Sequence, residues 1–241
     1  MPANPLLEVS ALGKRFGGFI ALEAIDLAVN DGERLGLIGP NGSGKSTLVN
    51  CMCGTLRNDA GSVRFAGHAL NGLSAHERTR LGLARSFQLP RPFNTLTLAE
   101  NLHVPLLYAG RHDGTRAIDA HCVDLLDMVG LADKATRLPR DLTQIEMRKL
   151  ELARAMAAAP RLLIADEAMA GLSHGEVDDI LALLIRLNEQ GVTVILIEHI
   201  MRAVMHFSQR LVVLVAGRKI ADGDPAAVIR DPDVVRAYLG E

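Results

Sequence analysis

The sequence predicts an α/β domain with a helical insertion. Short apolar runs with the length of buried strands occur at residues 34–38, 161–167 and 192–197, and an amphipathic helix separates the last two. From Leu98 to about Ala158 the periodicity of apolar residues becomes helical instead. A length of 241 residues suits one such domain, or a domain with a subdomain.

The first ninety residues predict short strands separated by turns. Alternating or continuous apolar residues place these strands at 6–12, 21–29, 34–38, 63–65 and 83–88. The strand at 63–65 is expected at the edge of a sheet. Glycine, asparagine and aspartate predict turns at 14–19, 30–32 and 60–62.

The helical segment and the C-terminal third follow in order. Apolar residues at steps of three and four predict a helix with the buried face Ile118, Cys122, Leu125, Leu126 and Val129. Thr115 with Asp119, and Thr143 with Glu146, predict two helix starts. Later elements are predicted as a helix at 177–188, a hairpin of strands 210–215 and 218–221, and tail helices at 225–230 and 234–239.

A glycine-rich loop follows the strand at 34–38 and precedes an apolar stretch that can start a helix. It matches the P-loop pattern Gly-x-x-x-x-Gly-Lys-Ser with Gly39, Pro40, Asn41, Gly42, Ser43, Gly44, Lys45, Ser46 and Thr47. Glycines let successive N–H groups form one concave anion nest, and the helix N-terminus adds its positive end. Lys45 would contact the β- and γ-phosphates of a nucleotide, and the Ser46 hydroxyl would ligate Mg²⁺. An incidental glycine turn would not require the flanking strand and helix.

Composition excludes several classes of function. A formal charge of −2 gives no basic field for nucleic acid or an anionic membrane, and 3% aromatic residues without tryptophan give no stacking platform for single strands.

No run reaches the ~18 apolar residues of a spanning helix. The first five residues lack the features of a signal peptide. The three cysteines, Cys51, Cys53 and Cys122, lack zinc spacing and are expected to be reduced core thiols of a cytoplasmic protein.

Four polar residues are expected beside the P-loop, beyond the carboxyl ends of parallel strands: Gln88, Asp166, Glu167 and His199. Asp166 ends an apolar strand, as a Mg²⁺ site opposite Ser46 requires. Glu167 can polarise an attacking water as general base. Gln88 can hold the metal or the water, and His199 can contact the γ-phosphate. Singly, these residues suit a loop, a helix start or a solvated surface. Together with the P-loop they favour hydrolysis of ATP with Mg²⁺.

This order of motifs resembles the ATP-binding subunits of ABC transporters over essentially the whole chain. The resemblance implies the ABC ATPase fold, an α/β P-loop NTPase core with an antiparallel β subdomain and an inserted α-helical subdomain. Residues 1–88 and 160–241 would form the ATP-binding core and about 89–159 the helical subdomain. It also implies that two subunits sandwich two ATP molecules, and that Phe16 stacks on adenine, although Phe16 also suits a plain core position.

Several stretches narrow the resemblance to branched-chain amino acid importers: 84–88, 98–102, 197–199 with Met201, and the tail 231–240. Residues 15–18 and the stretch after Gln88 look more like the longer of the two ATPase subunits of such importers. Urea, short amides and aromatic acids are the alternative cargoes in similar importers. The resemblance implies a second ATPase subunit, permease subunits contacted through the helical segment, an external solute-binding protein served indirectly, and a place on the inner face of the cell membrane.

Three other classes of function fit less well. An ABC ATPase of DNA repair or translation usually carries a coiled-coil insertion or a second fused domain, and neither is present. A module that only binds ATP would not need Glu167 beside Asp166. The third class is a kinase or a GTPase built on the same P-loop, and a GTPase requires an Asn-Lys-x-Asp guanine motif, which the sequence lacks.

One segment departs from the family pattern. Where ABC ATPases carry the signature Leu-Ser-Gly-Gly-Gln, this chain has Leu142 followed by Thr143, Gln144, Ile145 and Glu146. Side chains replace the glycines whose N–H groups approach the partner's γ-phosphate, and Glu146 adds a negative charge. Ser173 also stands where most of the family has Asp. We therefore hypothesise a heterodimer in which the site on this P-loop hydrolyses ATP and the second site turns over slowly. The alternative is that the altered signature still works.

Overall fold

Two sheets organise the chain in the computed structural model, which describes residues 5–87, 90–109 and 115–239. In these ranges the larger sheet has six strands in the order β10-β9-β3-β8-β7-β6. Neighbours pair in parallel except for the antiparallel hairpin of β9 and β10. The strands are β3 (Arg34–Ile38), β6 (Leu83–Ser86), β7 (Leu162–Asp166), β8 (Thr193–Ile197), β9 (Arg210–Val215) and β10 (Arg218–Gly223).

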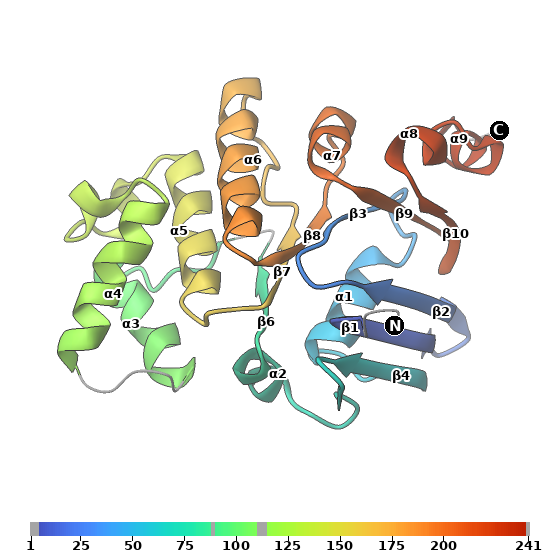
Figure 1. Cartoon of the computed structure of the whole chain (residues 1–241), viewed down its shortest axis with the longest axis horizontal. Coiled ribbons are helices and arrows are strands. Elements are labelled where there is room, and N and C mark those ends of the chain that lie inside the picture. Colours follow the sequence, from blue (N-terminus) through green and yellow to red (C-terminus); the bar gives the residue numbers. More distant parts are fainter. Residues whose placement is uncertain (1–4, 88–89, 110–114, 240–241) are drawn as a thin grey trace.

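The smaller sheet is antiparallel, in the order β2-β1-β4-β5. Its strands are β1 (Leu7–Phe16), β2 (Phe19–Val29), β4 (Ala60–Phe65) and β5 (His68–Ala69). Figure 1 shows it on the same side of the larger sheet as α1, opposite α6 and α7. The glycine loop runs between β3 and α1. The start of α1 is bordered by both sheets.

The helices form separate groups around the larger sheet (Figure 1). α3, α4 and α5 stand together at the end farthest from the antiparallel strands, while α8 and α9 lie beyond β9 and β10. The bounds are α1 (Lys45–Cys53), α2 (Ala75–Leu81), α3 (Leu98–Ala109), α4 (Thr115–Met128), η1 (Ala132–Lys134), η2 (Pro139–Asp141), α5 (Gln144–Met156), α6 (His174–Glu189), α7 (Met201–Phe207), α8 (Pro225–Val228) and α9 (Pro232–Leu239).

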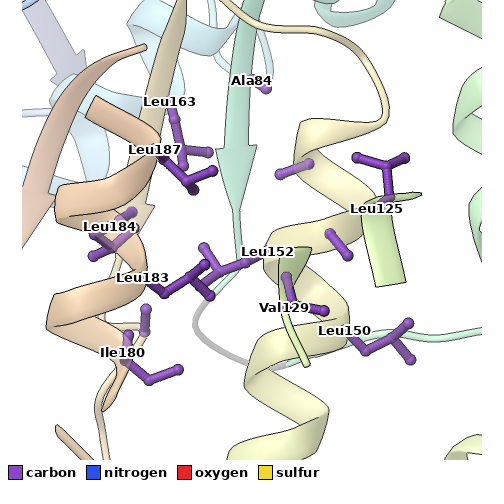
Figure 2. Packing of buried hydrophobic residues seen from close by; sticks show 14 of the residues in the cluster. Ala84, Leu125, Val129, Leu150, Leu152, Leu163, Ile180, Leu183, Leu184 and Leu187 are labelled. Carbon is purple, nitrogen blue, oxygen red and sulfur yellow. The ribbon is translucent and has the colours of Figure 1, made fainter. Parts of the chain in front are cut away.

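Alternate residues of the central strands face opposite cores. Val194 and Leu196 of β8 join the cluster that includes α4, α5 and α6, whereas Ile195 and Ile197 join the cluster with α1 and the antiparallel sheet. This is the two-residue period of a strand with both faces covered, and it explains why every residue of β7 and β8 is buried. In the first cluster, Leu152 of α5 and Leu183 of α6 point into the space between their helices (Figure 2).

The predicted α/β fold class, with antiparallel strands and inserted helices, is confirmed, but some local predictions are wrong. Residues 60–62, predicted as a turn, begin β4, and β4 lies between β1 and β5 rather than at an edge. The predicted turn at 14–19 shrinks to two residues because β1 and β2 extend into it. The short helices α2 and α7 were not predicted. For α2, Ser74 followed by Glu77 is a capping box that the sequence does display.

Candidate functional site

The glycine loop has a backbone that only glycine can adopt at its two ends. A Cβ on Gly39 would lie 2.1 Å from the carbonyl oxygen of Leu214, and one on Gly44 would lie 2.8 Å from that of Ala21. Gly44 also has φ of 105°, in the left-handed region. The backbones of strand β9 and of the antiparallel sheet therefore pack directly against the loop. Their backbones fix its curvature before the helix α1 begins at Lys45.

Lys45 is buried and lies against the loop that precedes it. Its Nζ donates hydrogen bonds to the carbonyl oxygens of Gly39 (2.7 Å) and Pro40 (3.1 Å). Burial lowers the pKa of Lys45, and the nearby carboxylates of Glu167 and Asp166 oppose that shift. The ammonium group is thus held inside the concave loop, close to two acidic residues from the end of β7.

One hollow, of about 260 Å³, joins the predicted nucleotide-binding residues. Its lining consists of Phe16, Phe19, Ala21, Asn41, Gly42, Ser43, Gly44, Lys45, Ser46, Thr47 and Glu167. Phe16 is 50% exposed at this hollow, with Lys14 Nζ 5.5 Å from its ring centre. The plain core position considered for Phe16 is therefore wrong, and its ring is accessible to a planar ligand.

The two acidic residues at the end of β7 have different partners. Asp166 is buried and its Oδ2 accepts a 2.5 Å hydrogen bond from Arg85 Nη2. Glu167 directs Oε1 to Nε2 of His199 at 2.7 Å. Glu167 also has φ of 49°, a conformation that costs energy for a residue with a side chain. Its N–H donates to the carbonyl of Ile197 on β8, which helps to hold this conformation.

Glu198 is a site residue that the sequence analysis missed. It lies in the sequence between the end of β8 and His199, and its side chain is buried. Its Oε1 accepts a 2.8 Å hydrogen bond from the N–H of Met169. Burial raises the pKa of Glu198, although the N–H groups of Met169 and His199 partly offset this shift. Glu198 thereby ties the loop after Glu167 to the residue that carries the imidazole. A glutamate closing an otherwise apolar strand was the available signal.

The residues available for a metal are oxygen donors. Ser46 is exposed at the glycine-loop hollow, and Asp166 stands at the end of the adjacent strand β7. A hydroxyl and a carboxylate suit Mg²⁺, which takes few protein ligands and completes its shell with phosphates and water. Gln88, the third predicted ligand, lies outside the described residues. Within the described ranges, no three or more His, Cys, Asp or Glu side chains gather into a metal cage.

The divergent segment at the start of α5 is a well-capped helix N-terminus. The Thr143 hydroxyl accepts from the N–H of Glu146, and the Glu146 carboxylate accepts from the N–H of Thr143 at 3.0 Å. Lys134 Nζ bonds the same carboxylate at 2.5 Å, and these bonds hold the pKa of Glu146 below its usual value. A lysine thus accompanies the added negative charge that the sequence analysis noted at this position.

The two residues that replace glycines lie differently. Ile145 is half-buried and packs against the core cluster that contains α5 and α6. Gln144 is exposed, and its Nε2 lies 3.4 Å from the carbonyl oxygen of Ala170, in the loop after β7. Arg148, one turn later, donates to the same carbonyl at 3.1 Å. The start of α5 is therefore bonded to the loop that follows Glu167.

The chain is similar to known families along its length. A model of ABC transporters matches residues 22–170, and a model of branched-chain amino acid ATP-binding cassette transporters matches residues 218–241. It is 39% identical to the high-affinity branched-chain amino acid transport ATP-binding protein BraF of Pseudomonas aeruginosa. It is 37% identical to LivG of Escherichia coli, which has the same description. Each match covers 99% of both chains.

Solved structures show the same fold. An ATP-binding cassette of an ABC transporter, MJ1267 in its ADP conformation, superposes with a TM-score of 0.90 at 30% identity, covering 98% of this chain and 99% of that one. The cassette MJ0796, a dimer in a post-hydrolysis state bound to ADP and phosphate, has a TM-score of 0.82 at 26% identity, covering 91% and 98%. None of the helices that the structure describes combines the length and the apolar character of a membrane span.

Proposed function

This chain belongs to the ABC transporter family of ATPases, and on that premise we propose that it powers the import of branched-chain amino acids through a membrane permease. One observation is the main support for a catalytic site on this chain's own P-loop. A single hollow joins the glycine loop, Lys45 and Glu167, and Glu167 is within hydrogen-bonding distance of His199. These are the groups needed to bind a triphosphate and to direct water at its last phosphorus atom.

The chain's own residues divide the work of hydrolysis. Loop N–H groups and Lys45 bind and orient the phosphates, and Phe16 stacks on the adenine. Glu167 accepts a hydrogen bond from the attacking water and takes its proton as the new P–O bond forms and the bond to ADP breaks. His199 holds the Glu167 carboxylate in place and contacts the γ-phosphate. Gln88, which lies outside the described residues, would hold the water or the metal.

Mg²⁺ is the metal that these oxygen donors fit. Ser46 and Asp166 would hold it, and when bound it neutralises charge on the β- and γ-phosphate oxygens. Lys45 supplies a further fixed positive charge near the same oxygens. The phosphates of ATP would occupy the concave side of the loop, whose backbone path a Cβ on Gly39 or Gly44 would disturb by clashing with Leu214 or Ala21.

The cargo follows from the relatives rather than from the ATP site. BraF and LivG are described as branched-chain amino acid transport proteins, and the tail of this chain matches a model of the same transporters. An external solute-binding protein and the permease would select the solute. Urea, short amides and aromatic acids are the second candidates, and an ABC ATPase outside transport is a more distant one.

Uptake of labelled leucine tests the proposed cargo. In cells that carry this chain, deleting it should abolish high-affinity leucine uptake, and restoring it should recover uptake, because the importer cannot cycle without its ATPase. Uptake of labelled urea, acetamide and phenylalanine should be unchanged. If uptake of one of these compounds is lost and leucine uptake is not, that compound is the cargo. If uptake of all four compounds is unchanged, a role in import is contradicted.

We place the permease contact at a groove of about 270 Å³ bordered by α2, β6, α3 and α5. Phe87 and Tyr108 line this side groove and are 46% and 73% exposed, respectively. Such exposed aromatic side chains suit a protein contact. A cytoplasmic loop of the permease would lie there, which would hold the chain at the inner face of the membrane.

We further propose that two ATPase subunits close over two ATP molecules and that the second subunit differs from this one. In the ATP-bound pair, the start of α5 would face the partner's γ-phosphate. Gln144 is exposed there, where a glycine would let the backbone N–H approach a ligand closely. The site completed by this α5 would therefore turn over slowly, while the site on this P-loop would hydrolyse ATP with a partner's intact signature.

Glycine substitutions at the start of α5 test this asymmetry. In the heterodimer, Gln144→Gly with Ile145→Gly should raise turnover at the second site, measured with the first site inactivated. Gln144→Gly alone is the better-folded companion, because Ile145 packs on the core. The wild-type chain alone should show little hydrolysis at any concentration. Turnover that rises more than linearly with concentration would instead indicate a competent homodimer, and the asymmetry would be refuted.

A further inference from the structure

Arg85 connects three parts of the molecule around Asp166, the carboxylate proposed above to hold Mg²⁺. From β6, its Nη2 donates to Asp166 Oδ2 at 2.5 Å, and its Nη1 donates to Asn50 Oδ1 on α1 at 2.7 Å. The Phe87 ring lies 5.3 Å from the guanidinium carbon and covers it from the side groove. Above, Arg85 was described only as the partner of Asp166, with no role of its own.

The pair is sheltered from water. Side-chain exposure is 14% for Arg85 and 7% for Asp166. A carboxylate in such surroundings is held strongly by a charged, planar donor, because little solvent screens the contact. The guanidinium group can hold Asp166 and Asn50 at once, which a single ammonium group on a flexible stem does less well.

The bonding pattern fixes the carboxylate relative to the P-loop helix. Arg85 engages Oδ2, so the second carboxylate oxygen can serve a cation near Ser46, at the start of the same helix that carries Asn50. Partners of this kind commonly orient metal-binding carboxylates, and their loss weakens metal binding.

Resting on the proposed function, we propose that Arg85 is a positioning residue that orients Asp166 for the Mg²⁺ ion that accompanies ATP. It does not touch the nucleotide. It holds one end of β7 and the middle of α1 in the register at which Asp166 and Ser46 can share one cation.

The test is the Mg²⁺ dependence of nucleotide binding in a protein that does not hydrolyse ATP. In a Glu167→Gln background, the affinity for trinitrophenyl-ATP is measured by fluorescence while Mg²⁺ is varied. Arg85→Met and Arg85→Lys should raise the Mg²⁺ concentration at half-effect, by about 10- to 100-fold for methionine. Lysine should recover part of the loss because it retains the charge. Binding of the nucleotide without Mg²⁺ should change little.

Arg154 provides a matched control. It also lines the side groove, pairs with a buried carboxylate (Glu151, 2.8 Å) and lies over an aromatic ring (Phe93, 5.4 Å), but within the described residues no hydrogen bond or ion pair joins it to Asp166 or to α1. Arg154→Met should leave the Mg²⁺ midpoint unchanged. A thermal unfolding curve of each variant separates loss of fold from loss of metal binding.

Several outcomes would overturn the inference. An unchanged midpoint in folded Arg85→Lys and Arg85→Met would make Arg85 purely structural. A lower midpoint would mean that Arg85 competes with the cation. An equal shift in Arg154→Met would mean that the effect is not specific to Asp166. If Arg85→Met does not fold, the milder Arg85→Lys decides the matter. A parent protein that binds no nucleotide at any Mg²⁺ concentration would refute the proposed function itself, which is a distinct result.

Discussion

Glu167→Gln is expected to lower ATP turnover by about 10²- to 10⁴-fold, the usual contribution of a general base, while ATP binding is retained. The amide has almost the same shape as the carboxylate and can still bond His199, which lies 2.7 Å from Glu167 Oε1. What it cannot do is take a proton from the attacking water. Phosphate release and equilibrium ATP binding, measured on the assembled ATPase pair, separate the two effects.

A matched substitution controls for the loss of a negative charge. Glu189 ends α6, is exposed and lies outside the glycine-loop hollow, so Glu189→Gln should leave turnover unchanged. If Glu167→Gln retained most of the wild-type rate, another group would have to act as the base. Loss of ATP binding together with turnover would instead indicate that the amide disturbs the strained backbone at this position, where φ is 49°.

Local sequence signals were sufficient for the elements that carry the P-loop. The strand 34–38 was predicted at its observed bounds because an apolar run ends in glycines that no regular element accommodates. The runs ending in Asp166 and in Ile197 were recognisable for the same reason, since central parallel strands are apolar on both faces. The capping box of Thr143 and Glu146 also predicted the start of α5.

The partners of the site residues could not be predicted in this way. Arg85 and Asp166 lie 81 positions apart, and only the pairing of β6 with β7 brings them together. Likewise, Lys134 approaches Glu146 through a fold of the helical segment, not through helical spacing. Periodicity reports which face of an element is buried, but it does not report which distant side chain meets it. The backbone conformation of Glu167 is held by a hydrogen bond to Ile197 of β8. The residues next to Glu167 in the sequence therefore do not predict it.

Lys45→Met is expected to weaken ATP binding by about 2 kcal/mol or more, which is roughly thirtyfold. The ammonium group lies against the concave loop, held there by the carbonyls of Gly39 and Pro40. Methionine has a similar length but cannot bond a phosphate oxygen. Titration with a fluorescent ATP analogue measures the loss, and Lys149→Met on α5, away from the hollow, is the control.

Stability should respond in the opposite sense to function at this position. Burial lowers the pKa of Lys45, so the folded protein binds this proton less tightly than the unfolded chain does, and at neutral pH that difference opposes folding. Lys45→Met removes this cost, and its thermal midpoint without nucleotide should equal or exceed that of the wild type. ATP stabilises the folded protein in proportion to how tightly it binds, so at the same ATP concentration the variant's midpoint should rise less than the wild type's. A full ATP-induced rise in Lys45→Met would show that Lys45 does not hold the phosphates, and the loop N–H groups alone would then account for binding.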